Sequence, residues 1–231
     1  MNLSLPRRTV ALGLLAGSLA LAGCGKNDSS SGSSSSGGSG SANASTQCPP
    51  ADGSAQKKQS FDDAPPMCID ANKTYSATMT TDVGDVVITL DAKKAPKTVN
   101  NFVVLSRYHF YDGVSFHRVI PGFMAQGGDP KGDGTGGPGY TIEDEFPQQG
   151  EYKEGSIAMA NTGQPNSGGS QFFIVTGDSG TALPPQYTLF GQVSKGMDVV
   201  KKIEADGNQD GSQEGTPVKK HTITSVKIEE K

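Results

Sequence analysis

The folded part of this chain is predicted to be a mainly β domain, built from eight short strands and two helices. Val86, Ile88 and Leu90 recur at every second position, which is the period of a strand with one face on a core. Apolar residues recur at helical spacing in two other segments, at residues 96–107 and 197–205. A succession of short strands with few helices favours a barrel or a sandwich.

The strands expected along the chain are at residues 75–81, 85–91, 115–120, 123–128, 156–160, 171–176, 188–193 and 221–229. In the segment 171–176, Phe172 and Ile174 are expected to face the core, while Phe173 and Val175 point the other way. A large aromatic side chain on the second face needs apolar surroundings of its own. A binding pocket on the outer wall of the sheet would provide them.

The N-terminal residues 1–23 have the pattern of a signal peptide. Two arginines precede an apolar run at residues 10–21, which is shorter than the about twenty residues needed to span a bilayer. The run ends in Leu-Ala-Gly-Cys at residues 21–24, which resembles the lipobox of bacterial lipoproteins. That resemblance implies that Cys24 is lipidated and anchors an extracytoplasmic protein to the cell membrane. An ordinary signal peptide that contains a cysteine is the alternative, and the paired arginines leave twin-arginine export open.

Residues 24–71 are predicted to form a flexible tether between the lipid and a domain at residues 72–231. Every residue from 29 to 41 is Ser or Gly, and the stretch up to about Ala71 holds almost no aliphatic side chains. Such a segment buries too little surface to offset the entropy lost on ordering. The tether is therefore expected to give reach and no fold of its own.

The three cysteines divide into one lipid site and one pair. If Cys24 carries lipid, Cys48 and Cys68 are left together in an oxidising, extracytoplasmic setting. A structural disulfide between them would close a loop of about twenty residues. A redox pair and a metal site are the alternatives, but both usually need a close C-x-x-C spacing, which this pair lacks.

Several other kinds of site are not supported by the sequence. The net charge is −4 with both signs spread along the chain, so no nucleic-acid partner is expected. His109, His117 and His221 are too scattered to indicate a metal site. The glycine-rich segment 127–139 lacks the ending of a phosphate-binding loop and is expected to be an irregular surface loop. No metal or cofactor is expected, and no G-x-S-x-G motif indicates hydrolysis.

Two long runs carry a specific family resemblance. The first is FHRVIPGFMAQGGD at residues 116–129, and the second is SIAMANTGQPNSGGSQFFIVT at residues 156–176. They resemble the two halves of the site of the cyclophilins, the cyclosporin-binding class of peptidyl-prolyl cis-trans isomerases. With the flanking segments, the resemblance covers residues 75–229. It implies a closed eight-stranded antiparallel barrel with a helix at each end, which binds substrate on its outer wall.

The resemblance assigns site residues position by position. Arg118 matches the catalytic arginine, and Tyr187 stands where eukaryotic relatives have a pocket histidine. The positions that match the proline pocket are Phe123, Met124, Phe173 and Leu183. The positions that match the groups holding the substrate chain and orienting the arginine are Gln126, the backbone at Ala160 and Asn161, and Gln171. Read alone, most pocket residues would be ordinary core, Asn161 a turn residue and Arg118 a solvated charge in a hairpin.

The chemistry implied for this site is rotation about an X–Pro amide, which is slow because its barrier is about 20 kcal/mol. In the rotated state the prolyl nitrogen regains its lone pair. A donor aimed at that nitrogen stabilises the rotated geometry more than the planar ground state. Arginine suits this role because it stays charged and places its N–H groups rigidly. We therefore expect an isomerase that assists the folding of exported proteins.

Two other functions fit the same residues. A binding module would hold proline-containing segments with slight turnover, and a scaffold would depend on its tether rather than on its groove. The expected partners are proline-containing peptides, unfolded exported proteins and the membrane through Cys24, and a monomer is expected. Strong cyclosporin binding is not expected, because Ala182 stands where eukaryotic relatives carry a tryptophan. Beside Leu183, Pro184-Pro185 replaces the usual Asp-Gly turn of those relatives.

Overall fold

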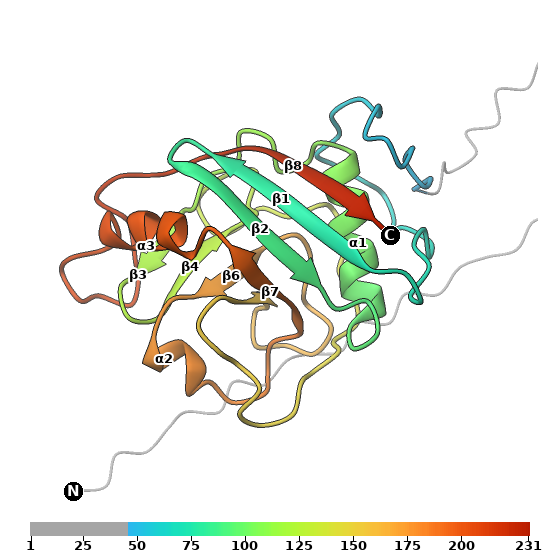
Figure 1. Ribbon diagram of the computed structural model, residues 1–231. Coiled ribbons are helices and arrows are strands. Elements are labelled where there is room, and N and C mark those ends of the chain that lie inside the picture. The colour runs from blue at the N-terminus through green and yellow to red at the C-terminus, as the bar shows by residue number, and fades with distance from the viewer. Residues whose placement is uncertain (1–45) are drawn as a thin grey trace, which may run out of the picture. The chain divides into compact units, whose positions relative to one another are not determined.

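The structure, a computed structural model, describes residues 46–231 (Figure 1). The expected signal peptide at residues 1–23 and the expected lipid site at Cys24 lie outside the described residues. Between residues 46 and 231, no helix has the length and apolar character needed to cross a membrane. The described residues belong to one compact unit of the chain, Ser41–Lys231.

Eight strands and three helices form in this range, at positions close to those predicted. The strands are β1 (Tyr75–Thr81), β2 (Gly84–Leu90), β3 (Arg118–Ile120), β4 (Met124–Gly127), β5 (Ser156–Met159), β6 (Phe172–Val175), β7 (Leu189–Lys195) and β8 (Ile223–Glu230). The helices are α1 (Pro96–Arg107), α2 (Asp178–Thr181) and α3 (Met197–Ala205). Only α2 was not predicted, because its sequence Asp-Ser-Gly-Thr carries no apolar period.

The strands form one curled antiparallel sheet in the order β3-β4-β6-β5-β7-β2-β1-β8. The sheet is an open half-barrel, so the predicted closed barrel is wrong: the edge strands β3 and β8 share no ladder. The residues just before β3 do contact the start of β8: Gly113 N donates to Ile223 O at 2.8 Å and Phe116 N to His221 O at 2.9 Å, around an isolated bridge from Ser115 to Thr222. The free edge of β3 pairs instead with the segment after α3, since Val119 N donates to Gly215 O at 2.7 Å and Val119 O accepts from Asn208 N at 2.9 Å. That segment occupies the edge that β8 would need.

The main core lies inside the curl of the sheet. In Figure 1, α1 lies toward one end of the sheet and α3 toward the other. From Thr98 to its end α1 is buried on all sides, whereas α3 buries one apolar stripe; the apolar side chains they bury include Val99, Phe102, Val103, Val199, Val200 and Ile203. Phe102 of α1 contacts Phe172 of β6 edge-to-face, with the ring centroids 5.8 Å apart. Such aromatic pairs add to the free energy gained from burial alone.

The two faces of β6 belong to different apolar clusters, as the alternation of its residues predicted. Phe172 and Ile174 are buried in the main core. Phe173 and Val175 point to the other face and join a second, smaller cluster with Met124 of β4. A strand that is apolar on both faces therefore links the core to the outer wall.

Residues 46–71, here called the N-terminal arm, pack against the domain although the sequence predicted a flexible tether there. Phe61 is 3% exposed and lies in the main core, with its ring 5.4 Å from that of Tyr108 and 6.2 Å from that of Tyr140. Phe61 N donates to Pro138 O at 2.8 Å. The folded part thus begins before the predicted boundary at residue 72. A mostly polar composition concealed a single aromatic anchor.

The expected disulfide closes the N-terminal arm. Cys48 and Cys68 are bonded, with their Cα atoms 5.4 Å apart. Cys68 N donates to Asn100 Oδ1 of α1 at 2.7 Å, and Asn100 Nδ2 donates to Pro66 O at 2.9 Å. The disulfide therefore ties the arm back on itself at the point where the arm is fastened to α1.

Replacing both cysteines by serine is expected to destabilise the domain by about 3 kcal/mol, because the unfolded chain regains the entropy of a loop of about twenty residues. The measurement is urea unfolding of the oxidised parent and of the Cys48→Ser, Cys68→Ser variant. Adding a reductant should move the parent toward the variant and leave the variant unchanged. Equal unfolding midpoints under oxidising conditions would show that the disulfide contributes nothing to stability.

Candidate active site

Three neighbouring strands bring the central site residues into one row. Arg118 of β3 is the cross-strand partner of Gln126 of β4, and Gln126 is in turn the partner of Phe173 of β6. Directly paired residues in an antiparallel sheet lie on the same face, with their side chains in contact range. The register therefore sets a cation, an amide and an aromatic ring side by side on the outer wall.

Arg118 is half-buried and held from two sides. Its Nε and Nη2 donate to the backbone carbonyl of Gln213 at 3.1 Å and 2.9 Å. Its Nη1 donates to Gln126 Oε1 at 3.3 Å, and the guanidinium carbon lies 5.9 Å from the ring centroid of Phe123. Burial lowers the pKa of Arg118 from its ordinary value, but an arginine remains charged at any physiological pH. The site thus holds a fixed positive charge beside apolar residues.

A chain of amides sets the orientation of Gln126. Its Nε2 donates to Gln171 Oε1 at 3.0 Å, and Gln171 Nε2 donates to the carbonyls of Gly134 at 2.9 Å and Gly136 at 2.8 Å. Because backbone carbonyls only accept, they require the amino group of Gln171 to face them. Gln171 then presents its oxygen to Gln126, and Gln126 presents its own oxygen to Arg118. The chain of hydrogen bonds from Gln171 through Gln126 therefore ends on the guanidinium of Arg118.

Asp129 shapes the loop at the far end of this chain. The carboxylate is 1% exposed and accepts from the backbone N–H groups of Lys131 at 2.7 Å, Asp133 at 3.1 Å and Gly134 at 2.6 Å. Burial raises the pKa of Asp129, but the backbone donors outweigh burial and hold this pKa below its ordinary value. A Cβ at Gly136 would lie 1.9 Å from Asp129 Oδ1, so the loop needs glycine there. The sequence predicted only an irregular surface loop.

The predicted proline pocket is assembled in the second apolar cluster. Its buried floor includes Met124, 1% exposed, and Phe173, 4% exposed. The partly buried side chains packed around this floor are Ile120, Phe123, Ala160, Leu183, Tyr187 and Leu189. The rings of Phe173 and Tyr187 meet edge-to-face with centroids 5.3 Å apart. All the residues assigned to the pocket therefore lie together.

Tyr152 belongs to the same cluster and was missed by the sequence analysis. It is buried beneath Tyr187, and burial raises the pKa of Tyr152 to about 12. Its hydroxyl donates to Tyr187 O at 2.6 Å and accepts from Tyr187 N at 3.1 Å. The phenol thus fixes the backbone that carries the Tyr187 ring. Tyr152 lies just before the second family run and outside both runs, so the resemblance gave no signal of this role.

The family model described as "Cyclophilin type peptidyl-prolyl cis-trans isomerase/CLD" matches residues 76–228 of this chain. The chain belongs to the cyclophilin family. The match spans the whole sheet from the first residues of β1 to near the end of β8, and it includes every residue of the site just described. The N-terminal arm lies outside it.

Bacterial relatives are similar over much of the same range. The probable peptidyl-prolyl cis-trans isomerase B of Mycobacterium tuberculosis is 41% identical over 170 residues, which cover 67% of this chain and 54% of that protein. Peptidyl-prolyl cis-trans isomerase B of Streptomyces anulatus is 44% identical over 172 residues, which cover 66% of this chain and 95% of that protein. This chain thus spans about half the length of the mycobacterial relative.

A solved structure shares the fold. The crystal structure of a cyclophilin type peptidyl-prolyl cis-trans isomerase from Cryptosporidium parvum aligns with a TM-score of 0.61 and 31% identity, over 68% of this chain and 98% of that chain. The same protein in the presence of the dipeptide Ala-Pro aligns equally well, with a TM-score of 0.61. The curled eight-stranded sheet is therefore a cyclophilin-like fold.

Beside the proline pocket this cyclophilin domain has a groove of about 480 Å³. Its lining includes Gln126, Ala160, Asn161 and Gln171, the four positions assigned to holding a substrate chain. Ala160 N already donates to Gln171 O at 2.9 Å, so the carbonyl is the part of the Ala160 backbone left for a ligand. Asn161 Nδ2 donates to Gln186 O at 2.8 Å. The Asn161 side chain therefore fastens the rim, and only its backbone remains for the assigned role.

The rim beside Leu183 departs from the usual sequence of the family, with Pro184-Pro185 in place of Asp-Gly. Ala182 caps the C-terminal end of α2, and Leu183 follows directly. The turn after it contains Pro184-Pro185 and brings Gln186 N to 2.7 Å from Pro184 O. Leu183 still packs on the pocket cluster. The unusual turn has therefore not displaced the pocket residue before it.

Asp129→Asn is expected to destabilise the domain by about 2 kcal/mol at pH 7, because charged acceptors of backbone N–H groups are worth more than neutral ones. The folded pKa lies below the unfolded one, so this stability is present above about pH 4 and is lost as the pH falls through the folded pKa. Unfolding free energies of parent and variant should therefore converge in acid.

Asp133→Asn is the matched control for this prediction, since Asp133 is an exposed carboxylate on the same loop. A surface substitution of this kind should change the unfolding free energy by less than about 0.5 kcal/mol. If the two variants show the same loss and the same pH dependence, burial of Asp129 is not what stabilises the loop.

Proposed function

We propose that this chain is a peptidyl-prolyl cis-trans isomerase that rotates X–Pro bonds in exported peptides and unfolded proteins. The observation that carries the proposal is Arg118, whose charge is held by Gln213 and Gln126 directly beside the apolar pocket. A pocket of this kind suits a pyrrolidine ring, which is apolar and carries no N–H. The arginine then lies next to the amide that precedes the ring.

Catalysis requires stabilisation of the rotated amide, and the chain has the groups for it. The prolyl ring would sit against Phe123, Met124 and Phe173, which fixes one side of the bond. N–H groups of Arg118 would then donate to the prolyl nitrogen, whose lone pair is free only in the rotated state. A rate gain of about 10⁵ needs roughly 7 kcal/mol of such differential binding. No bond is made or broken, so no nucleophile or general base is needed.

The groove would hold the residues that precede the proline. Ala160 lines this groove, and its carbonyl would accept from a backbone N–H of the peptide; Gln126 lies between the groove and the arginine. The Cryptosporidium parvum relative has been crystallised in the presence of Ala-Pro, a ligand with one residue before the proline. By analogy, a proline-containing peptide would lie across the groove and the pocket together.

The place of action that we propose is the outer face of the bacterial cell membrane, with a monomer anchored through lipid on Cys24. Support comes from the sequence pattern around Cys24 and from the disulfide between Cys48 and Cys68, since disulfides persist in oxidising compartments. Unfolded exported chains expose X–Pro bonds there. The isomerase would then remove a slow step from their folding.

Arg118→Ala is expected to lower kcat/KM by at least about 100-fold, because the variant loses the donor to the prolyl nitrogen. Arg118→Lys should recover little of this loss, since a lysine keeps the charge but not the rigid fork. The measurement is cis-to-trans relaxation of a short X–Pro peptide with the full chain, with circular dichroism to check folding. If the folded parent binds the peptide but leaves its relaxation rate unchanged, the chain is a proline-binding module and not an isomerase.

Tyr152→Phe is expected to raise KM about fivefold while kcat changes little. The ring still fills the pocket floor, but the backbone of Tyr187 loses both hydrogen bonds to the phenol, each worth about 1 kcal/mol at most. The measurement is the substrate dependence of the relaxation rate. A loss confined to kcat would contradict a role in shaping the pocket.

A further inference from the structure

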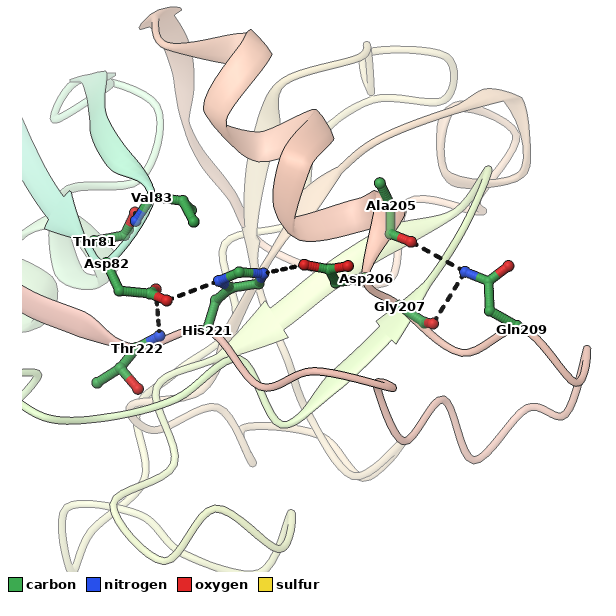
Figure 2. Close-up of polar contacts among 9 residues, drawn as sticks. All are labelled: Thr81, Asp82, Val83, Ala205, Asp206, Gly207, Gln209, His221 and Thr222. Atoms are coloured by element: carbon green, nitrogen blue, oxygen red, sulfur yellow. Dashed lines mark hydrogen bonds and ion pairs between the residues drawn. The ribbon is translucent and has the colours of Figure 1, made fainter.

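A buried histidine at the start of β8 lies between two carboxylates, outside the pocket and the groove. His221 is 1% exposed. Its Nδ1 lies 2.9 Å from Asp82 Oδ2, and its Nε2 lies 2.9 Å from Asp206 Oδ2 (Figure 2). Asp82 belongs to the turn between β1 and β2, and Asp206 directly follows α3. One ring therefore joins three separate parts of the fold.

The two contacts together fix the orientation of the His221 ring, because each ring nitrogen faces a carboxylate oxygen. Burial raises the pKa of Asp82, but the Thr222 N–H at 2.9 Å and the His221 contact outweigh burial and lower this pKa, so the carboxylate stays charged. A buried polar ring costs free energy unless its nitrogens are hydrogen-bonded. The two carboxylates provide one partner for each ring nitrogen.

The two contacts of His221 connect it to different parts of the fold. The contact with Asp82 reaches the β1–β2 turn, which is not part of the site. The contact with Asp206 closes the base of residues 206–221, here called the arginine loop, where Lys219 N also donates to Asp206 O at 3.2 Å. In Figure 2, the side chains of Asp206 and Asp82 approach the His221 ring from opposite sides.

The arginine loop runs along the free edge of β3 and ends on the guanidinium of Arg118. Gly215 O accepts from Val119 N at 2.7 Å, and Gln213 O accepts from both Nε and Nη2 of Arg118. Gln213 itself is exposed, so no burial of its side chain holds this carbonyl in place. Its position depends on where the loop is fastened.

We propose that the contact between Asp206 and His221 positions Arg118, by fixing the base of the loop whose Gln213 carbonyl orients the guanidinium. This inference rests on the proposed isomerase function. A displaced carbonyl would free the long side chain of Arg118 to sample other rotamers, and misplacement of a catalytic group by about 1 Å costs up to 100-fold in rate. His221 and Asp206 are then positioning residues that never touch the substrate.

The test compares Asp206→Ala with Asp82→Ala in the full chain. The two side chains are matched, since Asp206 is 43% and Asp82 is 40% exposed and each contacts one nitrogen of the His221 ring. Asp206→Ala should lower kcat about 5- to 10-fold with KM within about twofold of the parent, as for loss of one charge-assisted hydrogen bond. Asp82→Ala should destabilise the fold but leave kcat within about twofold of the parent. Asp206→Asn keeps an acceptor for Nε2 and should recover most of the rate.

A second measurement follows the arginine directly. Hydrogen exchange of the Arg118 Nε proton, observed by NMR, should be slow in the parent and in Asp82→Ala and faster in Asp206→Ala. Asp206→Ser, whose hydroxyl is too short to reach the ring, gives the same comparison if the alanine variant does not fold.

Either of two results would overturn the proposal: equal loss of kcat in both alanine variants, or unchanged kcat and unchanged Arg118 exchange in Asp206→Ala. In both cases the cluster would stabilise the fold without positioning the arginine. Failure of the isomerase function itself is distinguishable. If the parent shows no isomerase activity, the proposed reaction is wrong. Exchange of the Arg118 proton would still report whether Asp206 holds the guanidinium.

Discussion

The pairing of the half-buried Arg118 guanidinium is the interaction on which the site depends. A desolvated cation needs acceptors, and neither β3 nor its neighbour supplies enough of them. One acceptor is the side chain of Gln126 on β4, and the other is the backbone of Gln213, 95 residues along the chain. The fold must therefore place a distant loop against the edge of β3. The open edge of the half-barrel serves this purpose, because a β8 paired to β3 would leave no room for that loop.

Backbone carbonyls, which can only accept hydrogen bonds, set the orientation of the side-chain amides in the site. The carbonyls of Gly134 and Gly136 fix Gln171, which fixes Gln126, which faces its oxygen to Arg118. Were a single amide reversed, two donors or two acceptors would face each other. A relay of this kind keeps the guanidinium in one orientation without placing any carboxylate beside it, so the positive charge is left for the substrate.

The sequence predicted those segments in which apolar residues recur at a regular spacing. The positions of β2 and α1 follow from the periods of their apolar residues, and the two faces of β6 follow from the alternation of Phe172 and Phe173. The pocket came from the family resemblance. The contact between Gln213 and Arg118 could not be predicted, because it is made by a backbone carbonyl, which every residue type has. The packed N-terminal arm was missed because Phe61 is one aromatic residue among polar ones, and average composition conceals a single anchor.

Loops rather than strands position the groups that orient Arg118, and buried residues hold these loops in place. Asp129 gathers the backbone N–H groups beneath Gln171, and His221 closes the loop that carries Gln213. The N-terminal arm fastens the other end of the Asp129 loop: Phe61 N donates to Pro138 O, and Gly139, with φ +106°, would place a Cβ 2.2 Å from Phe61 O. Pro138 lines the groove, so an arm outside the family match supports one wall of it.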